Sequence, residues 1–136
     1  ECPHFDHEYT KDEANAELYA RLKEQVSEIM NSHAGIIRSE EGLKEGLKKI
    51  EALSQSIKQR QAQRQVSGRE YYLEASRRLL CVARLIMSPA LLRQESRGGH
   101  YREDFPCADE AYALHSVQRK GEEITTAPVN SNFFNF

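Results

Sequence analysis

Residues that could do chemistry gather in one short stretch of the sequence, ESRGGHYREDFP, residues 95–106. Within it His100, Arg102 and Asp104 occupy alternate positions, and Pro106 then excludes a return to helix. In an extended segment this alternation places the three side chains on one face. A guanidinium and an imidazole beside a carboxylate can form charge-assisted, bidentate hydrogen bonds. The spacing therefore predicts a polar cluster across a seam between two parts of a protein.

The rest of the sequence carries no recognisable catalytic motif. It has no GxGxxG after a strand to cradle a dinucleotide or flavin phosphate, and no GxSxG, HExxH or paired catalytic carboxylates. We therefore predict docking rather than catalysis for this stretch. The predicted docking residues are Glu95, Ser96, Arg97, His100, Arg102 and Asp104. Two alternatives stay open: the side chains satisfy helix carbonyls and a hairpin within this chain, or they contact a substrate or flavin directly.

A weak metal-binding pattern lies at the start of the chain. Cys2, His4 and His7 are donors that zinc or nickel accepts. A structural site needs a fourth ligand, and none is nearby in the sequence. A polar linker over residues 1–10 is the favoured interpretation.

Two helices are expected to carry the first half of the chain. Apolar residues recur every three to four positions from Lys11 to His33 and again after Ser39, a typical helix N-cap. The inward stripes consist of Leu18, Leu22, Val26 and Ile29, and of Leu43, Leu47, Ile50, Leu53 and Ile57. Gly42 and Gly46 lie one turn apart on the second helix, where they indicate either close approach by a neighbouring element or tolerated surface glycines.

The third expected helix, Arg69–Ser96, is apolar over a wide arc, which predicts contact with something beyond its two partners. Cys81 lies on this arc and is expected to be buried. Pro89 removes an amide donor and is expected to kink the helix. Gly98 and Gly99 are predicted to end it. The arc comprises Tyr72, Ala75, Leu79, Leu80, Val82, Ala83, Leu85, Ile86, Ala90 and Leu91.

The last part of the chain changes to a period of two, which predicts a short hairpin within Glu110–Val129 with Gly121 in its turn. The predicted fold is all-α: an antiparallel, spectrin-like three-helix bundle with a short C-terminal extended or hairpin segment. Its parts are a linker (1–10), the bundle (11–98), a docking loop and hairpin of the same domain (99–129) and a tail (130–136).

Composition narrows the classes of partner and compartment. The 136 residues suit one domain, and a net charge of −2 gives no long-range attraction to nucleic acid or membrane. The polar stretch Lys58–Gln65 lacks the aromatic residues of single-strand binders, so a solvated helix end is favoured over an RNA site. No apolar run is long enough to insert into a membrane. Three widely spaced cysteines argue against a disulfide framework, and we expect a cytoplasmic location.

Two segments carry a resemblance to a known family. ESRGGHYREDFP resembles the ESRGAHYREDFP-type segment of the flavoprotein family that contains L-aspartate oxidase and the flavoprotein subunits of succinate dehydrogenase and fumarate reductase. Gly99 replaces the usual alanine. The segment GIIRSEEGL, residues 35–43, is similar to the GI(V/I)RxEEGL segment of the same family's C-terminal domain. The resemblance covers roughly residues 15 to 129, with both motifs in the expected order.

The resemblance implies a helical C-terminal domain that packs on the flavin-binding domain upstream in the same chain. FAD and the catalytic residues would belong to the absent domains, and this fragment alone is expected to be inactive. Within the family the L-aspartate oxidase branch is favoured, which converts L-aspartate to iminoaspartate in NAD biosynthesis. The alternatives are a succinate dehydrogenase or fumarate reductase flavoprotein subunit, and a free-standing helical interaction module.

Overall fold

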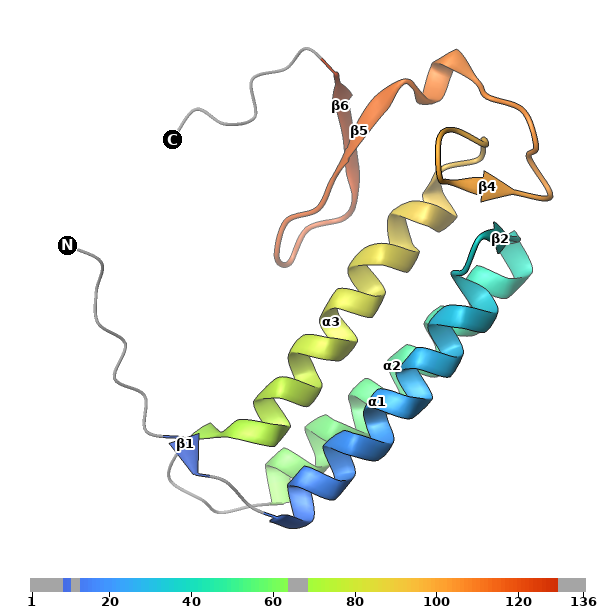
Figure 1. The fold of residues 1–136 in the computed structure, drawn as a ribbon. Helices are drawn as coiled ribbons and strands as arrows, with labels where there is room; N and C mark the ends of the chain where they lie inside the picture. Colours follow the sequence, from blue (N-terminus) through green and yellow to red (C-terminus); the bar gives the residue numbers. More distant parts are fainter. Residues whose placement is uncertain (1–8, 11–12, 64–68, 130–136) are drawn as a thin grey trace.

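The computed structural model describes residues 9–10, 13–63 and 69–129 and shows three long helices packed side by side. Helix α1 spans Glu13–His33, α2 spans Glu40–Gln63 and α3 spans Tyr71–Leu92. Consecutive helices run in opposite directions, so the start of α2 and the end of α3 lie at the same end of the bundle (Figure 1). The predicted antiparallel three-helix bundle is confirmed.

The core lies along the seam between the helices. The buried apolar residues are Leu22 and Val26 on α1, Leu43, Ile50 and Ile57 on α2, and Leu73, Leu80, Ala83, Met87 and Ala90 on α3. They follow the helical period read from the sequence, with Leu18, Ile29, Leu47 and Leu53 packed against them. Each fully buried large side chain contributes about 1.5–3 kcal/mol, so this seam supplies most of the stability of the bundle.

One glycine of α2 is required by the packing. A Cβ built on Gly46 would lie 2.2 Å from Met87 Cε and 2.8 Å from His33 Cβ, closer than real Cβ contacts allow. The same atom on Gly42 would lie 3.1 Å from the hydroxyl of Ser39, the expected N-cap, which accepts a hydrogen bond from the Gly42 amide. Of the two interpretations of these glycines, close approach therefore holds for Gly46.

Two expectations for α3 are wrong. The helix ends at Leu92 and not near Gly98, because the backbone of Arg93 is extended (φ −78°, ψ 105°) and the last carbonyls of the helix are satisfied by a side chain from outside it. Gly98 instead has φ +58° in a tight turn closed by two backbone hydrogen bonds between Arg97 and His100. Cys81 is exposed, because it lies on the side of the helix opposite the core.

Helix α3 continues through Pro89 for one further turn. Proline lacks the amide that would donate to the carbonyl of Leu85. The side-chain amide of Gln118 donates to that carbonyl instead, at 2.8 Å. This bond holds the turn of the C-terminal hairpin beside the middle of α3, as Figure 1 shows.

Six short strands form three separate pairs. Strand β1 (Tyr9–Thr10) is parallel to β3 (Arg69–Glu70), and β2 (Ile37–Arg38) is parallel to β4 (Tyr101–Arg102). After the 3-10 turn η1 (Glu110–Tyr112), β5 (Leu114–Val117) and β6 (Thr125–Pro128) form the predicted antiparallel hairpin, with Gly121 at φ +82° in the connection.

Several expectations fall outside the described residues. The candidate metal ligands Cys2, His4 and His7, the last part of the polar stretch after α2 and the tail 130–136 are among them. Within the described part of the chain, no group of three or more histidines, cysteines or carboxylates is placed to hold a metal ion. None of the helices described is long and apolar enough to span a bilayer.

Candidate functional site

The two family-like motifs of the sequence meet at one end of the bundle. Strands β2 and β4 pair in parallel, with Ile37 opposite Tyr101 and Arg38 opposite Arg102. The amide of Glu103 continues the pairing with a 2.9 Å hydrogen bond to the carbonyl of Arg38. Since the segments are far apart in the sequence, their contact belongs to the tertiary structure. We call the polar side chains gathered here the polar joint: Arg38, Arg93, Glu95, Ser96, Arg97, His100, Arg102 and Asp104.

Arg102 is the centre of the polar joint and is fully buried. Its guanidinium makes a bidentate ion pair with Asp104, with Nε and Nη2 each 2.7 Å from a carboxylate oxygen. The remaining nitrogen, Nη1, donates toward three carbonyls at the end of α3, at 3.0 to 3.2 Å. These carbonyls belong to Ala90, Leu91 and Arg93. The ring of Phe105 lies under the guanidinium, 5.1 Å from its carbon.

Asp104 carries the other half of the ion pair to a second helix. Its carboxylate accepts a 2.8 Å hydrogen bond from the amide of Glu40, the first residue of α2. The bidentate bond from Arg102, together with this amide, lowers the pKa of Asp104 from 3.8 to about 2, against the opposing effect of burial. The carboxylate is therefore ionised at any physiological pH.

The ion pair bridges two helix ends of opposite polarity. A helix carries partial negative charge at its C-terminus and partial positive charge at its N-terminus. Arg102 lies at the C-terminus of α3 and Asp104 at the N-terminus of α2, so each charge faces the helix end that favours it. The pair thus neutralises exposed backbone groups of both helices and fixes the ends of the helices relative to each other.

Glu95 forms a second buried centre of the joint. Its carboxylate accepts hydrogen bonds from Arg93, from Arg97 Nε at 3.1 Å and from the amide of Asp109 at 2.8 Å. Burial alone raises the pKa of Glu95, but these donors outweigh it and lower the pKa from 4.5 to about 2. An ionised, fully buried carboxylate with three donors holds the loop after α3 against the segment that leads into the hairpin.

His100 connects the joint to the connection between α1 and α2. Nδ1 lies 2.9 Å from Arg38 Nη1, and Nε2 lies 3.3 Å from the carbonyl of Arg93. Because a guanidinium can only donate, Nδ1 accepts and the single proton of the neutral ring is on Nε2. Burial lowers the pKa of His100, and the positive charges of Arg38, Arg102 and Arg93 lower it further.

The expectation of three side chains on one face holds only in part. Arg102 and Asp104 do form the predicted bidentate pair, but His100 bonds to Arg38 and not to the carboxylate. Strand β4 is only two residues long, and Asp104 lies in a turn closed by a 3.1 Å bond from the Phe105 amide to the Arg102 carbonyl. Alternation along an extended segment does not apply beyond the strand.

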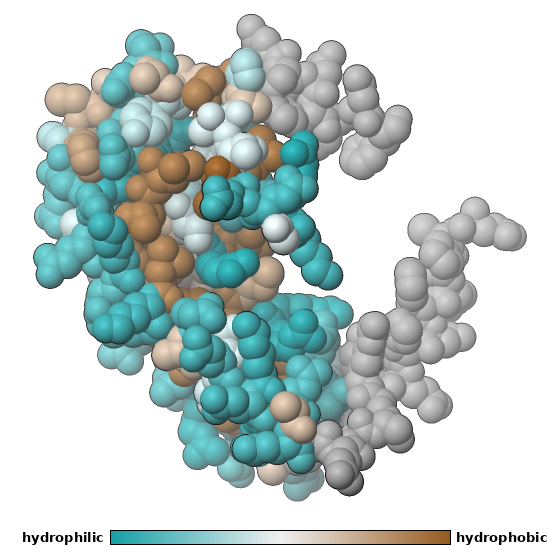
Figure 2. Space-filling model, turned by 180° about the vertical axis from the view of Figure 1, so that it is seen from behind, coloured by the Kyte–Doolittle hydropathy of each residue, from teal (hydrophilic) through white to brown (hydrophobic). Residues whose placement is uncertain are grey.

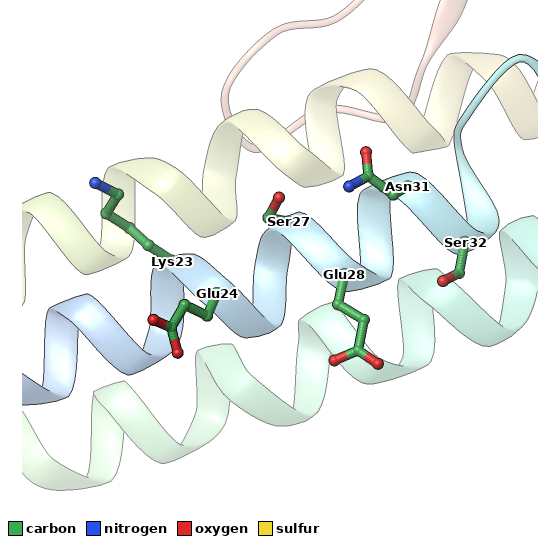
Figure 3. Close-up of a pocket in the computed structure, with 6 residues that line it drawn as sticks. All are labelled: Lys23, Glu24, Ser27, Glu28, Asn31 and Ser32. Atoms are coloured by element: carbon green, nitrogen blue, oxygen red, sulfur yellow. The ribbon is translucent and has the colours of Figure 1, made fainter.

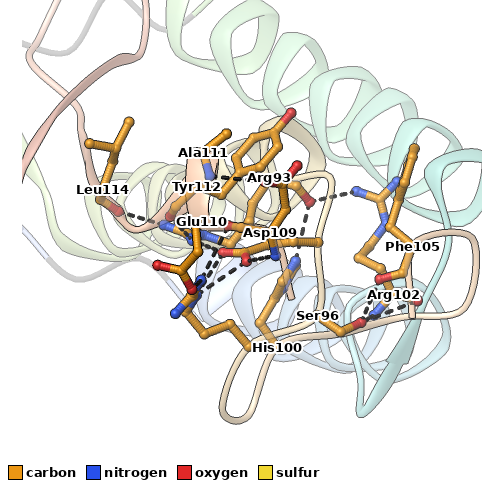
Figure 4. Close-up of polar contacts among 12 residues, drawn as sticks. Arg93, Ser96, His100, Arg102, Phe105, Asp109, Glu110, Ala111, Tyr112 and Leu114 are labelled. Atoms are coloured by element: carbon orange, nitrogen blue, oxygen red, sulfur yellow. Dashed lines mark hydrogen bonds and ion pairs between the residues drawn. The ribbon is translucent and has the colours of Figure 1, made fainter. Parts of the chain in front are cut away.

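Ser96 and Arg97 complete the predicted set. The Ser96 hydroxyl accepts from the Arg102 amide at 2.9 Å and donates to the Phe105 carbonyl at 2.8 Å. Arg97 is the most exposed member, with 39% of its side chain accessible, and also pairs with Glu110 at 3.3 Å. Figure 4 shows these contacts converging from the loop after α3.

Sequence analysis missed two members of the joint. Arg93 donates to the carbonyls of Tyr112 and Leu114, both at 2.6 Å, and so holds the start of the hairpin (Figure 4). Arg38 lies in the motif 35–43, whose similarity to the family was the available signal. Neither could be assigned a partner from spacing, because each bonds to residues distant in the sequence.

The contacts of the predicted docking residues lie within the chain itself. Glu95 and Arg102 are fully buried, and Arg102 satisfies helix carbonyls as the alternative interpretation had it. The structure thus gives these two side chains internal partners. Docking by this stretch to another domain stays a prediction, and Arg97 is the member with the most accessible surface.

The joint does not fit the phosphates of a flavin. A diphosphate binds where helix N-terminal amides and cationic side chains are free. The amides of Glu40 and Gly42 at the start of α2 are bonded to Asp104 and Ser39, and the amide of Leu73 in α3 is bonded to the capping residue Glu70. The arginines of the joint are likewise engaged. No chemistry of a flavin is therefore assigned to these residues.

The surface hollows offer no second site. Figure 3 shows one whose six lining residues, all from α1, project separately from a single helix. They are Lys23, Glu24, Ser27, Glu28, Asn31 and Ser32. A ligand site is normally concave, with polar groups from several elements converging on an apolar floor. A depression on one helix face lacks that convergence.

The fold and the joint together define a helical bundle whose end is closed by a polar lock and followed by a hairpin, the architecture of an accessory domain and not of a catalytic one. Residues 23–136 match the family model described as "Fumarate reductase flavoprotein C-term". The chain therefore belongs to this family of flavoprotein C-terminal domains.

Relatives within the family are much longer than this chain. The L-aspartate oxidase of Pyrococcus furiosus is 38% identical over 96 residues, which cover 71% of this chain and 16% of that protein. The chloroplastic L-aspartate oxidase of Arabidopsis thaliana is 34% identical over 78% of this chain and 17% of that protein. The fumarate reductase (CoM/CoB) of Methanothermobacter marburgensis contributes a polypeptide that is 34% identical over 64% of this chain and 16% of that protein.

Proposed function

We propose that this chain is the C-terminal domain of an FAD-dependent L-aspartate oxidase. The similarity to enzymes of that name, from 32% to 41% identity in archaea, bacteria and plants, is the observation that carries the proposal. The parent enzyme oxidises L-aspartate to iminoaspartate for NAD biosynthesis, with FAD as the acceptor of two electrons. The flavin-binding domain of the same chain holds the cofactor.

The role of this domain is structural. Its arginines and carboxylates are engaged with one another and with backbone groups, so they hold helix ends in place and do not act on a substrate. The fragment alone is inactive in this proposal. A cytoplasmic location belongs to the same proposal and is supported by Cys81 and Cys107, which are free and exposed as a reducing compartment permits.

The test uses the full-length protein encoded by the gene. After purification, a bound flavin is expected in the visible spectrum, and anaerobic L-aspartate is expected to bleach it within seconds. Succinate at the same concentration serves as the matched control and should leave the spectrum unchanged. Bleaching by succinate but not by L-aspartate would overturn the choice of substrate.

A second candidate is the flavoprotein subunit of a fumarate reductase or succinate dehydrogenase. It is favoured by the description of the family model and by the similarity to the fumarate reductase polypeptide of M. marburgensis. Oxidation of reduced flavin by fumarate does not separate the candidates if fumarate also serves the oxidase as acceptor. The separation rests on whether L-aspartate or succinate reduces the flavin.

A third candidate, a free-standing interaction module, is favoured by the outward apolar residues of α3. Val82, Leu85 and Ile86 are 52%, 42% and 46% exposed. This candidate requires an open reading frame without a flavin-binding domain. The sequence of the gene upstream of Glu1 decides it directly.

A further inference from the structure

The two segments of the polar joint expose large apolar side chains on their outer side. Ile36 is 85% exposed, Ile37 63% and Tyr101 42%. Ile37 and Tyr101 are direct partners in the β2–β4 pair, and Ile36 precedes Ile37. We call these three residues the apolar tip.

The polar joint holds the apolar tip in place. Successive residues of a strand point to opposite sides. In both strands the second residue, Arg38 or Arg102, points inward and is bonded within the joint, so the first residue must point outward. The tip cannot turn inward unless those bonds break. Burying the charged residues of the two motifs therefore places their apolar residues in solvent.

We propose that the apolar tip is the surface on which the flavin-binding domain of the parent chain docks. This inference rests on the proposed function, because it names the partner of the domain. The motif that resembles the family docks through Ile36, Ile37 and Tyr101, while its charged residues brace the backbone beneath them.

The small size of the tip favours an occupant in the same chain. Two independent proteins need an interface of about 1,000 Å² or more to associate stably. A tethered domain is present at an effective concentration in the millimolar range, so a few apolar contacts suffice. The chain spans only 16% and 17% of the length of relatives such as the P. furiosus and A. thaliana enzymes, so a large tethered body is at hand in such proteins. A second copy or a separate partner lacks this advantage.

The outer face of α3 is the rival surface. Figure 2 shows hydrophobic residues gathered in the upper half of the rear face, interrupted by hydrophilic ones. Val82 and Leu85 are less exposed than Ile36 and Ile37, and Gln118 of the hairpin already bonds to the Leu85 carbonyl. The hairpin thus lies beside this face, whereas the apolar tip projects from the end of the bundle.

Hydroxyl-radical footprinting of the full-length, flavin-loaded protein tests the inference. Ile36, Ile37 and Tyr101 are expected to react at least tenfold more slowly than Val129, which has a comparable exposure of 57% and serves as the internal reference. Reaction of the tip at the rate of Val129 would overturn the proposal. Protection of Val82 and Leu85 with a reactive tip would assign the interface to α3.

Paired variants of the full-length protein supply a second readout. I36S/I37S is expected to lower the temperature at which flavin fluorescence is released by several degrees, with V82S/L85S as the matched control of equal chemistry. Equal shifts in both variants would refute docking through the tip. Wild-type protein that binds flavin but is not reduced by L-aspartate would refute the proposed substrate and leave docking intact. Protein that binds no flavin would refute both.

Discussion

At the scale of single residues, the molecule depends on charges that are buried in pairs. Arg102 and Glu95 are fully buried, and every charge they carry meets an opposite charge or a backbone group. Such groups contribute little net stability when complete, yet removing one partner leaves the other unpaired in a desolvated place. The residues of the joint are therefore sensitive to substitution although none of them is catalytic.

Replacing Arg102 with methionine tests this sensitivity. The change leaves the Asp104 carboxylate and three carbonyls of α3 without their donor, so a loss of about 3–5 kcal/mol in the free energy of unfolding is expected. Urea denaturation of the 136-residue chain, followed by circular dichroism, measures it. Arg77→Met, which removes an exposed arginine paired with Glu74, should cost less than about 1 kcal/mol. Similar losses in the two variants would contradict a central role for Arg102.

His100 should make the stability of the chain depend on pH near neutrality. Its folded-state pKa is lowered by burial and by Arg38, Arg102 and Arg93, so the unfolded chain binds a proton first as the pH falls. Its contribution is complete above the unfolded pKa of about 6.5 and decreases as the pH falls from there toward the lowered folded value. The free energy of unfolding of the wild type should thus fall between pH 7 and pH 5.

His100→Gln isolates this contribution. A glutamine can accept from Arg38 with its oxygen and donate to the Arg93 carbonyl with its amide nitrogen, but it does not titrate. The variant should lose less stability between pH 7 and pH 5 than the wild type does. Parallel curves for the two proteins would show that His100 is not the titrating group.

At the scale of elements, the helices are held by close packing along their length and by charge at their ends. Gly46 lets Met87 and His33 approach the backbone of α2, and the Arg102–Asp104 pair joins the end of α3 to the start of α2. The hairpin is attached at two points, by Arg93 at its start and by Gln118 at its turn. Each device acts between elements that are separated in the sequence.

Gly46→Ala should destabilise the bundle despite the better helix propensity of alanine. The new methyl group would overlap Met87 and His33, and overpacking of this kind costs about 1–3 kcal/mol. Gly42→Ala is the matched control on the same helix, one turn earlier, where the gain in propensity of up to about 1 kcal/mol can appear. Thermal unfolding of both variants gives the comparison. A melting temperature of Gly46→Ala at or above that of Gly42→Ala would contradict the packing argument.

At the scale of the whole molecule, one end of the bundle is organised by ionised carboxylates. Asp104 and Glu95 both have a pKa of about 2 in the folded protein. The two groups join the ends of α2 and α3, the loop after α3 and the segment before the hairpin. The stability of this end therefore depends on acid more than that of the apolar seam between the helices.

Acid titration tests this dependence. Since both folded pKa values lie below the unfolded ones, the stabilisation is complete above about pH 4.5 and is lost as the pH falls toward 2. Asp104→Asn should lower stability at pH 6, by an amount on the order of 1 to 2 kcal/mol, and the difference from wild type should shrink toward pH 2. Glu17→Gln, at an exposed pair on α1, should show no such convergence. A difference that stays constant with pH would contradict the argument.

The sequence by itself determined the three helices, their inward stripes and the hairpin. These features follow from local periodicity, capping residues and turn glycines, each of which acts within a few positions of the chain. The resemblance of two short motifs also led to the family that the comparisons show. Their spacing indicated a polar cluster with a bidentate Arg102–Asp104 pair.

Only the tertiary structure decided what the cluster contacts. That Arg102 ends α3 at Leu92, that Asp104 begins α2 and that Arg38 holds His100 depends on segments brought together by packing. The exposure of Cys81 was decided in the same way, because a wide apolar arc does not show which of its sides faces the core. Local pattern specifies the elements, but the partners of a charge are set by the distances between elements, which the order of residues along the chain does not contain.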